Sequence, residues 1–89
     1  MSDRIRSSVS NNAFQFLLTD LDVALTFMNV AESTRDADAQ QRNHKNARRA
    51  YDAVVRLMQS LSLDDTQNKE LAEKLALLKS RLQNVGQYF

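Results

Sequence analysis

The side chains best suited to catalysis or metal binding are few, and they do not form a set. His44 is the only histidine and the chain has no cysteine, so neither a histidine-rich nor a thiolate metal centre can be built. Gln41 stands three residues before His44, where a carboxylate-bridged metal site would have glutamate. We therefore expect no metal or other cofactor. We interpret His44 as a partly buried, hydrogen-bonded residue beside the apolar positions Ala47 and Tyr51.

The acidic residues do not form a catalytic pair either. Asp20 and Asp22 are two positions apart, which places them on different sides of a helix. Asp36 and Asp38 begin like a calcium loop, but the sixth position is not glycine and the twelfth is not glutamate. Helix capping explains these two residues better, and the single glycine excludes a glycine-rich phosphate loop. The sequence predicts no catalytic residues and a protein that is not an enzyme.

Positive charges cluster from "RNHKNARR" onward. In a helix they would form a basic face opposite the apolar side, made of Arg42, Lys45, Arg48, Arg49 and Arg56. Such a row can contact phosphates, but Asp52 interrupts it and no aromatic residue is interleaved for base stacking. We interpret it as a solvated face, partly complementary to the acids Asp20, Asp22 and Glu32 of the first helix. A nucleic-acid accessory protein is the less favoured alternative.

Composition predicts the fold class and narrows the function. The chain has 89 residues, one glycine, no proline and a net charge of +1. The scarcity of turn formers, with abundant good helix formers, predicts a single all-α domain. The weak net charge argues against a protein devoted to polyanions or anionic membranes. The apolar runs look shorter than the roughly 20 residues of a membrane span, and no signal peptide is evident, so we expect a cytoplasmic protein outside the membrane.

Capping signals divide the chain into three long helices, predicted at residues 12–33, 36–60 and 64–85. Asn12 is the expected first cap, Asp36 begins the second helix, and either Ser62 or Asp64 caps the third. Gly86 is placed to end the third helix in a left-handed cap. Short connections favour antiparallel neighbours. The prediction is an up-down-up three-helix bundle over residues 11–86, with a flexible tail at 1–10 and a short C-terminal tail at 87–89.

The first predicted helix is apolar on more than one side. One stripe faces the bundle, and a second stripe on the other side consists of Phe16, Val23, Phe27 and Val30. One possibility is that the third helix, or Val9, Tyr88 and Phe89, folds over this second stripe. The other is that the stripe is an interface, either a homodimer seam or a groove for a helix of another protein. We predict an interface, and self-association is the leading hypothesis.

Part of the chain resembles known helical domains. "NARRAYDAVVRLMQSL" resembles the second helix of a tetratricopeptide hairpin, in which a small residue, here Ala47, is followed four positions later by an aromatic residue, here Tyr51. Continued through "LDDTQNKELAEKLALLKSRLQ", the pattern is similar to the three-helix microtubule-interacting and trafficking domain. The resemblance implies a protein-binding role without catalysis.

Overall fold

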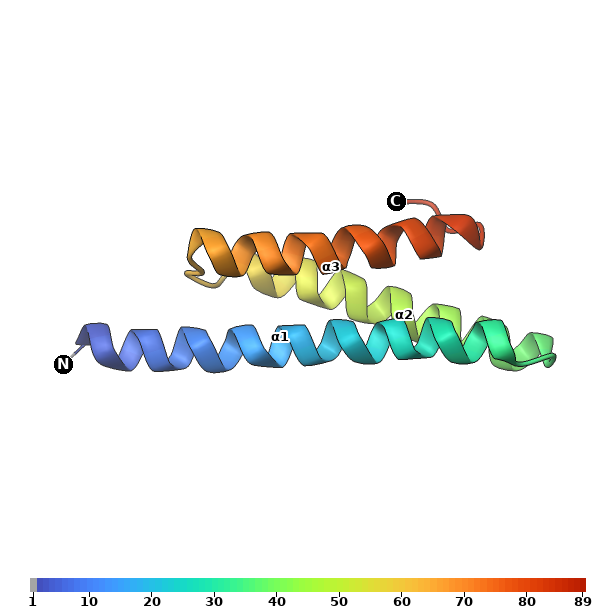
Figure 1. Cartoon of the computed structure of the whole chain (residues 1–89), viewed down its shortest axis with the longest axis horizontal. Helices are drawn as coiled ribbons and strands as arrows, with labels where there is room; N and C mark the ends of the chain where they lie inside the picture. Colours follow the sequence, from blue (N-terminus) through green and yellow to red (C-terminus); the bar gives the residue numbers. More distant parts are fainter. Residues whose placement is uncertain (1) are drawn as a thin grey trace.

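The chain folds into three α-helices, and each runs antiparallel to the one before it (Figure 1). The computed structural model describes the backbone of residues 2–89 and the side chains of residues 11–89. Helix α1 spans Ser2–Ser33, α2 spans Ala37–Met58 and α3 spans Asp65–Asn84. The bundle is elongated, with extents of 53 × 18 × 16 Å. The predicted all-α, up-down-up three-helix bundle is confirmed.

Helix α1 begins at Ser2, ten residues before the predicted start at Asn12. The added stretch contains neither proline nor glycine, so nothing in it sterically ends the helix. A cap residue is required only where the chain leaves the helical conformation. The first turns of α1 project beyond α2 and α3 in Figure 1. The flexibility expected for residues 1–10 stays a prediction.

The other two helices begin where the sequence predicted a cap. The Asp36 carboxylate accepts hydrogen bonds from two backbone N–H groups at the start of α2, at 3.0 and 3.4 Å. Asp64, and not Ser62, caps α3. Its carboxylate accepts from the Gln67 backbone N–H at 2.7 Å, while the Gln67 side chain accepts from the Asp64 N–H at 3.1 Å. This reciprocal capping box satisfies two donors that a helix end otherwise leaves unpaired.

The core lies between the three helices and is wholly apolar among the described side chains. Its members are Phe14, Leu17, Leu21, Ala24, Met28 and Ala31 of α1, Ala47 and Val54 of α2, and Leu71, Leu75, Leu78 and Leu82 of α3. The leucines of α3 alternate spacings of four and three, which keeps them on one side of the helix. Small side chains on α1 and α2 allow a close approach of the two helices.

Two acidic residues of α1, Asp22 and Glu32, pair with α3, and not with α2 as the sequence suggested. Asp22 forms an ion pair with Lys74, and Glu32 forms one with Arg81 at 2.7 Å. Lys74 and Arg81 both belong to α3, so Asp22 and Glu32 lie on the side of α1 that faces this helix. The expected complementarity with the basic face of α2 is therefore wrong for Asp22 and Glu32 and stays a prediction for Asp20. Most of that basic face is left to solvent.

Candidate functional site

A row of exposed apolar side chains follows the outer side of α1. Phe16 is 60% exposed, Val23 44% and Val30 45%. They recur every seven residues, and such a row drifts by only about 20° around the helix per repeat. The predicted ridge is thus uncovered at these three positions. This spacing is the one that α-helices use to pack side by side in coiled coils.

Threonines extend this row without adding charge. Thr19 and Thr26 follow Phe16 and Val23 by three positions, as the second apolar position of a heptad does. Each threonine hydroxyl donates a hydrogen bond of 3.0 Å to the backbone carbonyl four residues earlier. Both hydroxyl donors are therefore satisfied within the helix, and an interface could cover them without breaking these bonds. We call this surface the α1 seam: Phe16, Thr19, Val23, Thr26 and Val30.

Phe27 does not belong to the exposed row. It is half-buried and packs against the core cluster. It follows Val23 by four positions, which is a rotation of about 40° around the helix axis. That rotation turns its ring toward the core. Of the four residues predicted to form the interface, three are exposed and Phe27 packs against the core beside them.

The C-terminal residues do not cover the α1 seam, because α3 ends in a turn that sends them to α2. Gly86 has φ +95°, a left-handed conformation that glycine adopts without steric cost. Its N–H donates to the Gln83 carbonyl at 3.0 Å, and the Gln87 N–H donates to the Leu82 carbonyl at 3.0 Å. These two bonds define a Schellman motif. We call residues 85–89 the C-terminal segment.

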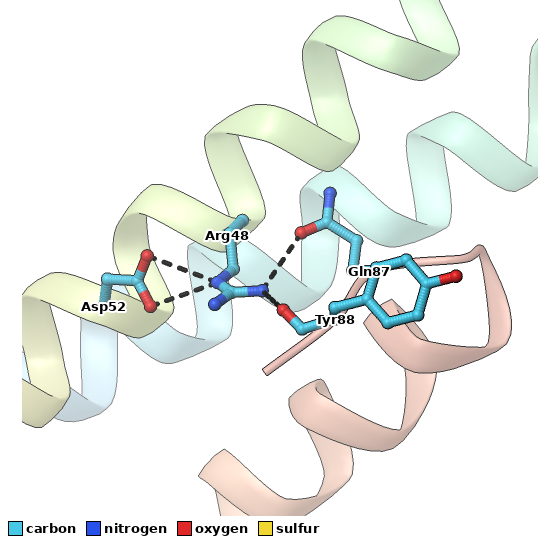
Figure 2. Close-up of polar contacts among 4 residues, drawn as sticks. All are labelled: Arg48, Asp52, Gln87 and Tyr88. Atoms are coloured by element: carbon cyan, nitrogen blue, oxygen red, sulfur yellow. Dashed lines mark hydrogen bonds and ion pairs between the residues drawn. The ribbon is translucent and has the colours of Figure 1, made fainter.

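Arg48 of α2 holds the C-terminal segment (Figure 2). Its Nη1 donates to the backbone carbonyl of Tyr88 at 2.6 Å and to Oε1 of Gln87 at 3.4 Å. Its Nε donates to both carboxylate oxygens of Asp52, at 3.1 and 3.2 Å. Arg48 is thus engaged within the chain, and the sequence was wrong to group it with the freely solvated cations. The sequence indicated that Asp52 interrupts the basic row; in the structure its carboxylate holds the Arg48 side chain in place.

Aromatic contacts complete this attachment. The Phe89 ring lies under the Arg48 guanidinium, 3.8 Å from its central carbon to the ring centroid. Tyr51 meets the same ring edge to face, with centroids 4.9 Å apart. A cation over an aromatic face and an edge-to-face aromatic pair are both attractive arrangements. The tail predicted at residues 87–89 is therefore docked on α2.

An open hollow of about 710 Å³ lies between α2 and the C-terminal segment. We call it the basic hollow, and its lining is Gln41, His44, Lys45, Arg48, Arg49, Val85, Gly86, Gln87 and Tyr88. The lining contains no carboxylate side chain. The structure thus divides the predicted basic face, because Arg42 and Arg56 are not part of the hollow.

His44 lies half-buried at the basic hollow. The predicted partial burial is confirmed, but within residues 11–89 the structure shows no hydrogen bond to its ring. The same side chains include no group of three residues that could hold a metal ion. Chemically, these surfaces offer apolar contact on α1 and positive charge on α2.

One observation modifies the expectation about membranes. The segment Asn11–Ser33 is long and apolar enough to cross a bilayer by length and composition, with a mean hydropathy of 1.2. The expectation that every apolar stretch falls short of a span was therefore too strong. The core helix of a water-soluble bundle and a membrane-spanning helix both meet this criterion.

Comparisons with protein families, with curated proteins and with solved structures find no match. The fold is that of a small three-helix bundle. The two surfaces described above are the features from which function can be inferred.

Proposed function

We propose that this protein is a non-catalytic protein–protein interaction module that self-associates through the α1 seam. The observation that carries the proposal is the exposed seven-residue repeat of Phe16, Val23 and Val30. Its flanking threonines are neutral and internally hydrogen-bonded. The seam residues carry no charge, and the threonine hydroxyls already donate hydrogen bonds within α1. Such a surface can be buried against another helix without leaving these hydroxyl donors unpaired.

A second copy of the chain fits this seam by symmetry. In an antiparallel pair of α1 helices centred on Val23, each Phe16 lies opposite the other copy's Val30, since both are seven residues from the centre. Large side chains then face small ones, the arrangement that fills a helix interface best. A two-fold interface of this kind uses the same patch on both subunits, so one seam is sufficient.

The expected strength of this dimer is modest. Full burial of such a side chain is worth about 1.5–3 kcal/mol, and these three are about half-exposed to begin with. Six half-exposed side chains, three from each copy, therefore contribute about 4–9 kcal/mol, against an association cost of similar size. Contacts of the threonine methyl groups add to the total. Even the largest of these gains exceeds the smallest association cost by only about 5 kcal/mol, so we expect a weak dimer with a dissociation constant of roughly 0.2–1 mM.

Sedimentation equilibrium from about 1 µM to about 1 mM covers the range in which such a dimer dissociates. Phe16→Asp and Val23→Asp place a carboxylate in the seam and should give folded monomers. Leu77→Asp is the matched control, because Leu77 is 53% exposed on α3 and lies outside the seam. Its variant should associate like the original chain.

Two results would overturn self-association through this seam. One is a monomer at every concentration, which would favour the alternative adaptor role in which α1 receives an amphipathic helix of another protein. The other is an equal loss of association in the Leu77→Asp control. Circular dichroism of each variant separates a lost interface from a lost fold.

A further inference from the structure

Cations gather on one wall of the basic hollow without an acidic partner there. Lys45, Arg48 and Arg49 lie within five consecutive positions of α2 and line the hollow together. Lys45 and Arg49 are exposed, and among residues 11–89 neither forms an ion pair. The Asp52 carboxylate, three positions after Arg49, already accepts from Arg48, so the charge of Lys45 and Arg49 is available to an external anion.

The facing wall is fixed by the fold. The Schellman turn at Gly86 returns the chain toward α2, and Arg48 binds the Tyr88 carbonyl at 2.6 Å. Carboxamide groups of Gln41 and Gln87 line the same space. The hollow, of about 710 Å³, is open to solvent, so a small anion can reach the cations on its wall.

From this geometry we propose that the basic hollow binds a phosphate group, with Lys45 and Arg49 as the anion-contacting residues and Arg48 as a positioning residue. A lysine ammonium is a compact positive charge, and an arginine guanidinium offers paired N–H donors that match phosphate oxygens. Residues four apart on a helix lie on the same face, so Lys45 and Arg49 can approach one group together. Arg48 contributes by holding the C-terminal wall.

A discrete anion suits the hollow better than a nucleic-acid strand. A strand would run along the whole basic face, but Arg42 and Arg56 lie outside the hollow, and Asp52 separates Arg49 from Arg56 in the row. The C-terminal segment also limits the hollow on one side. Continuous phosphate contacts favour an uninterrupted stripe, which this helix does not present.

Pyrophosphate is a suitable probe because it carries the phosphate chemistry without a base or a peptide. Titration of the full chain, followed by amide chemical shifts at constant ionic strength, should move signals of residues 41–49 and 85–88. Lys45→Gln combined with Arg49→Gln should weaken binding by about tenfold or more, since each removes a charge-assisted hydrogen bond. Arg42→Gln combined with Arg56→Gln removes the same charge outside the hollow and should change affinity by less than about twofold.

Three outcomes would overturn the proposal. No localised shift at about 10 mM pyrophosphate would show that the hollow has no useful affinity for the anion. Equal weakening by both double variants would indicate diffuse attraction along α2. Tighter binding of a single-stranded oligonucleotide, dependent on Arg42 and Arg56, would favour the nucleic-acid alternative. All four positions are exposed, so the variants should fold, and a thermal melt of each checks this.

Discussion

The guanidinium of Arg48 stacks on the ring of Phe89, with 3.8 Å between its central carbon and the ring centroid. Forty-one positions separate the two residues, and the second lies outside the helices. The stacking combines with the hydrogen bond from Arg48 to the Tyr88 carbonyl. The end of the chain is therefore part of the folded bundle, and the docking of this segment shapes the basic hollow.

This contact can be measured with a double-mutant cycle of Arg48→Gln and Phe89→Leu. We expect a coupling free energy of about 0.5–1 kcal/mol, the usual value for a partly exposed cation–π pair. Urea unfolding of the four proteins gives the value. The control cycle uses Arg49→Gln in place of Arg48→Gln, together with Phe89→Leu. Arg49 is exposed and stacks on none of the described aromatic rings. A coupling near zero in the first cycle would mean that the stacking contributes nothing to stability.

Gly86 should be sensitive to substitution for a purely conformational reason. Its φ of +95° is unfavourable for a residue with a Cβ atom, yet an added Cβ would meet nothing within 4 Å. Gly86→Ala should therefore cost about 1–2 kcal/mol of unfolding free energy through backbone strain alone. Gly86→Asn should cost less, because asparagine tolerates left-handed conformations better. Thermal and urea unfolding compare the two, and an alanine variant as stable as the original would contradict this interpretation.

Much of the fold was predictable because its signals are local. A cap such as Asp64 and the leucine spacing of α3 act over a few residues, so sequence alone shows them. The candidate surfaces depend on which helix sides meet in space. The seven-residue spacing separates Phe27 from the row of Phe16, Val23 and Val30, but spacing alone does not show how far around α1 the core extends. Nothing near Arg48 in sequence indicates that the C-terminal segment returns to it. The pairing of Asp22 and Glu32 with α3 was missed for the same reason.

The capping box of α3 can be tested against the alternative cap that the sequence allowed. Asp64→Ala should lower the unfolding free energy by about 1 kcal/mol, because the Gln67 N–H loses its acceptor at 2.7 Å. Ser62→Ala should change it by less than about 0.5 kcal/mol, since Ser62 is exposed and does not cap the helix. Urea unfolding at neutral pH measures both. If the serine variant were the less stable, α3 would begin earlier than the structure shows.

The two phenylalanines of α1 provide the sharpest test of where the core ends and the α1 seam begins. Phe27 packs against the core cluster, whereas Phe16 is 60% exposed. Phe27→Asp should cost more than about 2 kcal/mol, because it places a charge against apolar side chains.

Phe16→Asp should instead cost only about 1 kcal/mol when both chains are measured as monomers, because less than half of its side chain is buried. Unfolding followed by circular dichroism at low protein concentration isolates the monomer from any association. If Phe16→Asp were as damaging as Phe27→Asp, the outer side of α1 would belong to the core, and the proposed interface would lose its structural basis.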